Sequence, residues 1–286
     1  ISTLLSFVQY FKCPKSTFLQ LFLLFAFRTF IFTIPHKIIN HCKIRYHPIW
    51  TVAMKRKEFR KEHQKKHPYP RFRTRRAILR NSIAFLASIL LNYKVEGQEN
   101  LPEKGPLLIV NNHFHFLDTI SPIHSTKYPL EFIGDHVMPN APVALRVLPR
   151  LWRTLEIQQG TANLEAIRAA EAILAQDGIL AIMPEGHVHK PPLREALPGA
   201  AFLALRLGVP ILAIGTFSED NWDIFGTIRN KKRKARVTSK IGKVFGPLKI
   251  ADGGTRPSRD DVNRARHEIM SQIAALLPPE VRGEFG

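Results

Sequence analysis

Short, wholly apolar runs alternate with segments of helical periodicity from residue 93 onward, and this alternation most constrains the fold. Strands are expected at 93–96, 106–111, 130–134, 178–183, 209–215 and 235–245, and helices at 117–126, 140–150, 161–176, 196–207 and 257–277. Continuous apolar runs are typical of strands buried on both faces, and the helices between them are typical of crossover connections. The sequence therefore predicts an α/β layered fold with a largely parallel central sheet.

Positive charge is concentrated before this alternating region. The chain has 286 residues and a net charge of +19, and residues 1–95 hold 19 Lys and Arg against two acidic residues. Residues 96–286 hold 23 basic residues against 21 acidic ones. We therefore divide the chain into a basic, partly helical N-terminal appendage, residues 1–76, and a body, residues 77–286. Such a basic block is typical of a surface that contacts polyanions, either an anionic membrane or nucleic acid.

Two apolar stretches lie in and beside the appendage. Residues 18–34 are a candidate membrane helix, but they are short for a span and contain Arg28, so a helix in the headgroup region or packed on a partner is the alternative. If they cross the bilayer, the basic residues after Pro35 predict a body on the cytoplasmic side. Residues 78–91 predict a helix that is apolar over most of its circumference, which suits either a membrane interface or a protein core.

A histidine and an aspartate follow the first buried strand. His113 and Asp118 come directly after the apolar run 107–110, and they are too far apart around a helix to meet on one of its faces. They can meet if His113 lies in the turn and Asp118 in or just before the first helical turn. A desolvated histidine that a carboxylate orients can act as a general base toward a hydroxyl. A loop histidine and a helix-capping aspartate would give the same spacing, so the pair alone does not establish a site.

Two further clusters follow at characteristic distances. Residues 178–186 predict a strand that ends in Pro-Glu-Gly, and residues 208–214 contain Val-Pro-Ile after a helical run. The ordered set, with Asn112-His113-x4-Asp118 at its start, resembles the glycerolipid acyltransferase family, typified by lysophosphatidic acid acyltransferase. The resemblance covers residues 77–286.

This resemblance implies an acyltransferase with the α/β fold of that family and no cofactor, using acyl-CoA or acyl carrier protein as the acyl donor. His113 would be the general base, and Asp118 would orient its imidazole. Substrate contacts would come from Asn112, Glu185, Gly186 and Gln159. We expect Glu185 either to bind acceptor hydroxyls or to support the turn that carries His113.

Two phosphate contacts that are usual in the family are missing here. Gln158 or Gln159 stands where an arginine is expected, and His187 stands where threonine is usual. Lys190 and Arg194 are candidates to supply the lost positive charge, because a glutamine lacks the charged fork with which arginine binds phosphate. We expect lysophosphatidic acid as the acceptor, with a different lipid alcohol as the alternative.

Other kinds of site and function find little support. His187 and His189 have a spacing seen in zinc sites, but no required third ligand is evident, so no metal is expected. A basic binding protein without catalysis, acting on nucleic acid or membrane, is the alternative from another class. Phe and Leu dominate a hydrophobic helix of the appendage, whereas nucleic-acid-binding arms interleave cations with exposed rings. We therefore expect a membrane-associated enzyme on the cytoplasmic face, with a lipid acceptor, a thioester donor, possible contact with acyl carrier protein and no nucleic acid partner.

Overall fold

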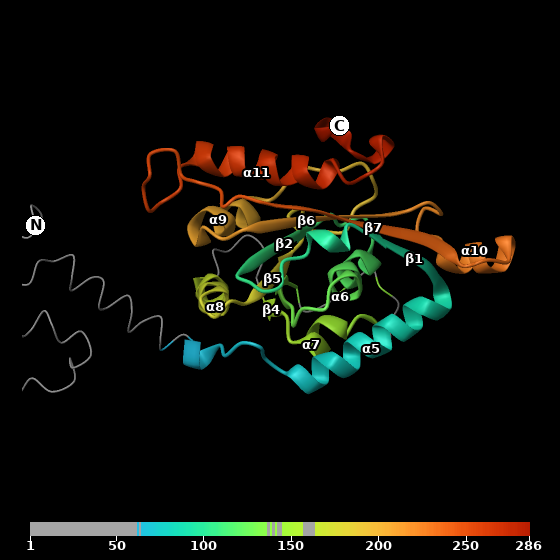
Figure 1. The fold of residues 1–286 in the computed structure, drawn as a ribbon. Coiled ribbons are helices and arrows are strands. Elements are labelled where there is room, and N and C mark those ends of the chain that lie inside the picture. The colour runs from blue at the N-terminus through green and yellow to red at the C-terminus, as the bar shows by residue number, and fades with distance from the viewer. Residues whose placement is uncertain (1–61, 63, 136–137, 139–140, 142–144, 157–163) are drawn as a thin grey trace, which may run out of the picture. The chain divides into compact units, whose positions relative to one another are not determined.

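A computed structural model describes residues 62, 64–135, 138, 141, 145–156 and 164–286 (Figure 1). The candidate membrane helix 18–34 and most of the basic appendage lie outside the described residues. In chain order the elements are α5 (Arg73–Leu90), β1 (Leu91–Glu96), η2 (Gln98–Asn100), β2 (Leu107–Asn111), η3 (Phe116–Ile120), α6 (Ser121–Ser125), β3 (Glu131–Gly134), α7 (Leu148–Trp152), β4 (Leu155–Glu156), α8 (Leu164–Leu174), β5 (Ile179–Ile182), α9 (Pro198–Leu207), β6 (Ile211–Ser218), α10 (Ile224–Lys231), β7 (Ala235–Phe245), α11 (Arg259–Ala274), η5 (Pro279–Val281) and η6 (Gly283–Phe285).

The strands form a sheet with the order β1-β7-β6-β2-β5-β3-β4 in the described part of the chain. Neighbouring strands run parallel except β6 and β7, which are antiparallel. The predicted α/β fold with a mostly parallel sheet is therefore confirmed. Strand β7 has the predicted bounds, and the other five predicted strands differ from the structure by a few residues at their ends.

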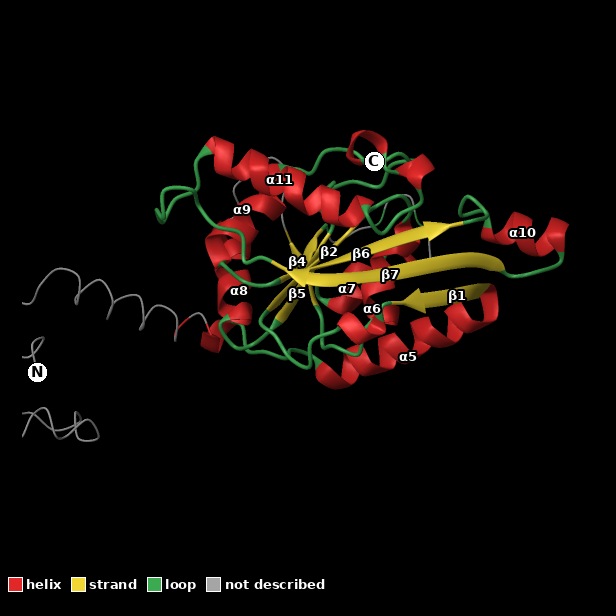
Figure 2. Cartoon of the chain, turned by 45° about the horizontal axis from the view of Figure 1, so that its top comes forward, coloured by secondary structure: helices red, strands yellow, loops and turns green. Residues whose placement is uncertain are grey.

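Helices cover both faces of the sheet, with α9 and α11 on one side and α5, α6 and α7 on the other (Figures 1 and 2). Strand β2 shows why the strands are apolar throughout. Leu108 and Val110 pack into the core cluster that includes residues of α8, α9 and α11, whereas Leu107 and Ile109 pack into the cluster that includes residues of α5 and α6. Successive side chains of a strand point to opposite faces, so both must be apolar here.

Two predicted helices are shorter than expected. The predicted helix 117–126 is divided into η3 and α6, and of the predicted helix 140–150 only α7 is helical among the described residues. Both α6 and α7 have a proline in their first turn, Pro122 and Pro149, where the lack of a backbone N–H favours a new helix start over continuation. Strand β4 and helix α10 were not predicted at all.

Helix α5 begins at Arg73, ahead of the boundary at residue 76 that charge alone suggested. Arg76 is buried in this helix, and its guanidinium nitrogens contact both oxygens of Glu131 at 2.5 and 2.8 Å. Its Nε also donates to the carbonyl oxygen of Trp152 at 3.1 Å. The start of α5 is thus joined to β3 by a buried ion pair and to α7 by a hydrogen bond. No helix among the described residues has the length and hydropathy needed to cross a bilayer.

Candidate active site

His113 lies in the turn after β2, and Asp118 lies in the 3-10 helix η3, which is the arrangement that their spacing predicted. Strands β2 and β5 are parallel neighbours, so their carboxyl ends meet at one edge of the sheet. Glu185 follows β5 there. The backbone N–H of His113 donates to Oε2 of Glu185 at 2.6 Å, and this contact joins the first two sequence motifs.

Glu185 supports the turn that carries His113. Its Oε1 lies 2.5 Å from Nε2 of His189 and also accepts the backbone N–H of Arg194 at 3.2 Å. The backbone N–H of His189 in turn donates to the carbonyl oxygen of His113 at 3.1 Å. The buried carboxylate thus has three partners, the His113 N–H, the His189 ring and the Arg194 N–H, so of the two roles expected for Glu185 the structure shows support of the turn.

His189 is a buried partner of Glu185. Burial lowers the pKa of His189, but the hydrogen bond and charge of Glu185 and the hydrogen bond to the Lys190 carbonyl raise it by more, so the net pKa is raised. Both ring nitrogens have partners, since Nδ1 lies 2.8 Å from that carbonyl oxygen. Among the described residues, no group of three or more His, Cys, Asp and Glu side chains is arranged to hold a metal ion.

The imidazole of His113 is neutral at physiological pH. Its pKa is lowered to about 4, mainly by burial and also by the neighbouring histidines, while a hydrogen bond to the backbone of His115 opposes these effects. A neutral imidazole has a nitrogen lone pair that can accept a proton. His113 is therefore in the protonation state that a general base requires.

Asp118 is fully buried beside the same turn. Its Oδ2 accepts the backbone N–H of His115 at 2.7 Å, while burial raises its pKa well above the usual range for an aspartate. Oδ1 of Asp118 and Nδ1 of His113 are both buried without a hydrogen-bond partner among the described residues. These are atoms that an orienting hydrogen bond between the two side chains would use. That bond is not present in the structure and stays a prediction.

Asn112 pairs its buried side-chain amide with the backbone of β6. It is fully buried, its Nδ2 donates to the carbonyl oxygen of Thr216 at 2.8 Å, and its Oδ1 accepts the Thr216 N–H at 2.7 Å. The side chain thus pairs with β6 as a strand backbone would. The structure shows this contact, and the expected substrate contact of Asn112 stays a prediction.

The remaining predicted substrate contacts differ in position. Gly186 has a φ of 74°, and a Cβ there would lie 2.2 Å from Cδ1 of Leu197, so the turn after Glu185 requires glycine. Lys190 and Arg194 are exposed, and neither side chain has an ion-pair partner among the described residues. Gln159 and its neighbour Gln158 lie outside the described residues.

The model of the family described as Acyltransferase matches residues 92–216, a span that contains His113, Asp118 and Glu185. This region belongs to the acyltransferase family. The match covers β1 through β6, and hence the strand ends and turns that position His113.

Two similar proteins carry related names. A curated 1-acyl-sn-glycerol-3-phosphate acyltransferase of Borreliella burgdorferi is 27% identical over 146 residues, which are 48% of this chain and 55% of the relative. The chain thus spans about half the length of the curated relative that it matches. The crystal structure of the 1-acyl-sn-glycerophosphate acyltransferase PlsC from Thermotoga maritima is 18% identical, with a TM-score of 0.46 over 75% of this chain and 87% of that one.

Sequence reasoning missed two residues of this acyltransferase-family site. His189 seemed an ordinary loop histidine, although its distance of four positions from Glu185 was visible. Thr216 gave no signal, because it is more than 100 positions from the Asn112 amide that it binds. Its hydroxyl also joins Ser121 and Ser239 in a buried hydrogen-bonded group beneath the turn.

Proposed function

We propose that this protein transfers an acyl group from a thioester donor to a hydroxyl of a lysophospholipid, with lysophosphatidic acid as the first candidate. The observation that carries the proposal is the neutral, desolvated His113 at the carboxyl end of β2, held there by Glu185 and Asn112. The family match and the name of the bacterial relative support the same chemistry.

In the proposed reaction, His113 takes the proton from the acceptor hydroxyl as that oxygen attacks the thioester carbonyl. A tetrahedral intermediate forms, and its collapse breaks the carbon–sulfur bond and releases the thiolate, which takes the proton back from the imidazolium. The products are the acylated lipid and the free thiol of the donor. Asp118 would orient the imidazole through its unpartnered Oδ1 and stabilise the imidazolium as it forms. The reaction needs neither a covalent acyl-enzyme nor a cofactor.

A panel of acceptors tests this function. We expect lysophosphatidic acid to be a better substrate than monoacylglycerol, and we expect Arg194→Ala to raise its KM. Arg194 follows Glu185 in the chain and its backbone binds that carboxylate, so its exposed guanidinium starts from a segment attached to the site. A charge-assisted contact to phosphate contributes about 1.5–3 kcal/mol, so the expected rise is roughly tenfold or more. Steady-state kinetics of thiol release measure both quantities.

The control for this panel is Arg256→Ala, which removes an exposed arginine near the start of α11. Its KM for lysophosphatidic acid should equal that of the unaltered protein. If monoacylglycerol exceeded lysophosphatidic acid tenfold in kcat/KM, the acceptor would be a neutral lipid alcohol. Absence of thiol release with any lipid acceptor would contradict acyl transfer itself.

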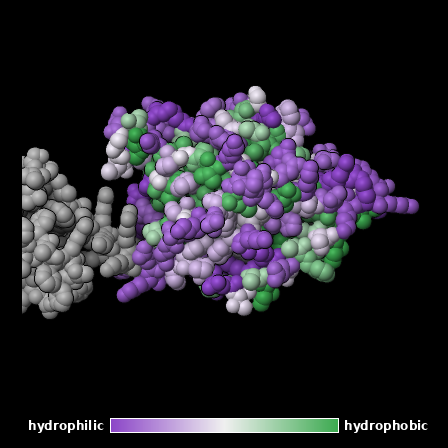
Figure 3. Space-filling view, in the orientation of Figure 1, coloured by the Kyte–Doolittle hydropathy of each residue, from purple (hydrophilic) through white to green (hydrophobic). Residues whose placement is uncertain are grey.

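We further propose that the protein acts at an anionic membrane surface on the cytoplasmic side. Helix α5 buries Ile83 and Ala87 but leaves Phe85 and Ile89 at 65% and 49% exposure. Hydrophobic residues gather along α5 at the surface, next to a hydrophilic region over α10 (Figure 3). The adjoining segment carries the cationic run Lys231–Lys234, part of which pairs with Asp220. An apolar helix face beside cations suits insertion among anionic headgroups.

Replacing Phe85 and Ile89 together by glutamine should weaken binding to vesicles that contain anionic lipid. Full burial of such a side chain contributes about 1.5–3 kcal/mol, so partial insertion of both predicts at least roughly tenfold weaker partitioning. Vesicle sedimentation measures it, and added salt should weaken binding of the unaltered protein. Val244→Gln, an exposed apolar residue of β7, is the control. Equal binding by the double variant and the control would contradict a role of α5, and tighter binding to RNA than to vesicles would contradict a membrane partner.

A further inference from the structure

We infer that an arginine-lined pocket beside the edge strand β4 binds the phosphate-rich nucleotide end of a coenzyme thioester. This inference rests on the proposed function, because it concerns the donor of the same reaction. The pocket has a volume of about 740 Å³, which lies in the range of sites for small organic molecules. Its walls come from the start of α5, from α7 and the turn after it, from β4 and from the start of α8.

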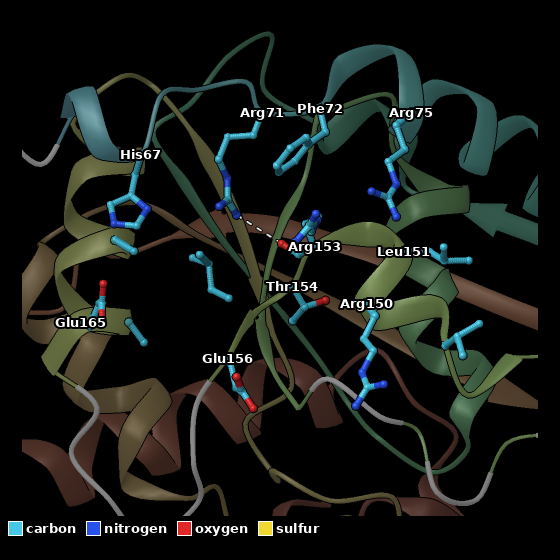
Figure 4. A pocket seen from close by; sticks show the side chains of 14 residues that line it. His67, Arg71, Phe72, Arg75, Arg150, Leu151, Arg153, Thr154, Glu156 and Glu165 are labelled. Atoms are coloured by element: carbon cyan, nitrogen blue, oxygen red, sulfur yellow. Dashed lines mark hydrogen bonds between the residues drawn. The ribbon is translucent and has the colours of Figure 1, made fainter.

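Four arginines, Arg71, Arg75, Arg150 and Arg153, line this pocket. In Figure 4, Arg71 and Arg75 extend from the segment at the start of α5, and Arg153 lies between them in this view. Arg71 pairs with Glu131. The other three guanidiniums have no carboxylate partner among the described residues. Glu165 also lines the pocket, but its carboxylate pairs with Lys66.

Such a group of cations is suited to a ligand with several phosphate oxygens. A guanidinium binds phosphate through two parallel hydrogen bonds, and it loses less hydration energy than an ammonium does. Guanidiniums that share one pocket repel one another, so an anion of more than one charge relieves more of that repulsion than a single carboxylate can. The ligand is thus expected to carry at least two negative charges.

Phe72 adds a flat apolar surface to the pocket. Phe72 is 45% exposed, and its ring centre lies 5.7–5.8 Å from the guanidinium carbons of Arg71, Arg76 and Arg153. Its φ of 51° is unusual for a bulky residue and persists only where surrounding contacts enforce it. A nucleotide base can stack on an exposed aromatic ring of this kind while the neighbouring arginines bind the phosphates of the same nucleotide.

The position of the pocket distinguishes the two substrates. Strand β4 is separated from β2, which carries His113, by β5 and β3, and this order places it on the order of 14 Å across the sheet. In a lysophospholipid the phosphate lies only a few bonds from the hydroxyl that His113 must reach. In a coenzyme thioester a long flexible arm separates the nucleotide phosphates from the sulfur. The pocket therefore suits the donor rather than the acceptor.

Calorimetric titration of the full chain with adenosine 3′,5′-bisphosphate tests the inference, because this probe carries the base and phosphates but no acyl group. We expect saturable binding that Arg150→Ala/Arg153→Ala weakens at least tenfold, since each lost arginine–phosphate contact contributes about a tenfold change or more. Arg256→Ala/Arg259→Ala removes two exposed arginines elsewhere and should bind the probe as the unaltered protein does. Phe72→Leu should weaken binding of the nucleotide but not of pyrophosphate.

Several results would overturn the inference. They are absence of nucleotide binding, equal binding by both double variants, equally tight binding of pyrophosphate and nucleotide, and loss of lysophosphatidic acid binding with nucleotide binding retained. The last would place the acceptor in the pocket. Failure of this inference is distinguishable from failure of the proposed function, because His113→Ala should bind the nucleotide normally while losing acyl transfer.

Discussion

Replacement of His113 by alanine is expected to lower the rate of acyl transfer about 10²–10⁴-fold, because a positioned general base contributes that much to such a reaction. The fold should persist, since the contacts that hold this turn are made by the backbone N–H and carbonyl of His113, which alanine keeps. Thiol release with lysophosphatidic acid measures the rate, and circular dichroism verifies the fold. His267→Ala, which removes an exposed histidine of α11, should retain full activity. Near-normal turnover by a folded His113→Ala protein would contradict the mechanism.

The pH dependence of the unaltered protein tests the same residue independently. Only the neutral imidazole can act as the base, so kcat/KM should fall as the pH decreases through the pKa of His113. Burial lowers that pKa to about 4, so the acidic limb of kcat/KM should lie near 4 rather than near 6.5. If Asp118 binds the imidazole once substrate is present, the limb of kcat should lie at a higher pH than the limb of kcat/KM. A kcat/KM limb at or above 6.5 would contradict a desolvated base.

Arg76→Met should lower the free energy of unfolding by about 3 kcal/mol, the lower end of the range for breaking a buried ion pair, because it removes one of the two arginines, Arg71 and Arg76, that pair with Glu131. Glu131 is fully buried, and Arg76 contacts both of its oxygens. Urea unfolding measures the loss. Methionine keeps most of the side-chain volume, so the change reports on charge and hydrogen bonds rather than on a cavity.

The matched control for this pair is Arg206→Met, which removes an exposed ion pair with Glu171. Exposed pairs contribute about 0.2–1 kcal/mol, so this variant should be nearly as stable as the unaltered protein. Adding Glu131→Leu to Arg76→Met should recover part of the lost stability, since the buried carboxylate, which Arg71 alone would pair with in the single variant, is then removed. Equal losses in the two single arginine variants would show that the Arg76 pair does not act as a buried one.

The sheet was predictable from the sequence because a strand that is buried on both faces has apolar residues at nearly every position, which gives a continuous apolar run. The two residues of β4 are too few to show any period. Helix α10 was not predicted because Gly226 interrupts its helical pattern of apolar residues. The side chain of Asp223 caps the helix, but this signal was not recognised in the sequence. The ion pair of Arg76 and Glu131 joins residues 55 positions apart, and no local pattern encodes such a contact.

The positions of His113 and Asp118 in a turn and a helical turn were predicted from the sequence, but the contacts that hold the turn were not. His113 and Asp118 lie where their spacing placed them, in a turn and in the helical turn that follows. The role of Asn112 was not visible, because an amide that binds a backbone 104 positions away resembles any polar residue beside a catalytic histidine. The contact between Glu185 and His189 was equally hard to predict. Residues four positions apart are neighbours on a helix, but in a loop that spacing does not determine whether two side chains meet.

The pairing of β1 with β7 sets the order in which the chain can fold during synthesis. Leu91 aligns with Ala235, so β1 leaves the ribosome long before the only strand that it pairs with among the described residues. At translation rates of about 5–20 residues per second, that interval lasts roughly 7–30 s. Throughout it, the apolar cluster that Ala87 and Leu91 share with Val237 is incomplete. During this period the part of α5 that carries Ala87 is available to a chaperone and, if the protein binds membranes as proposed, attachment to the bilayer can precede completion of the sheet.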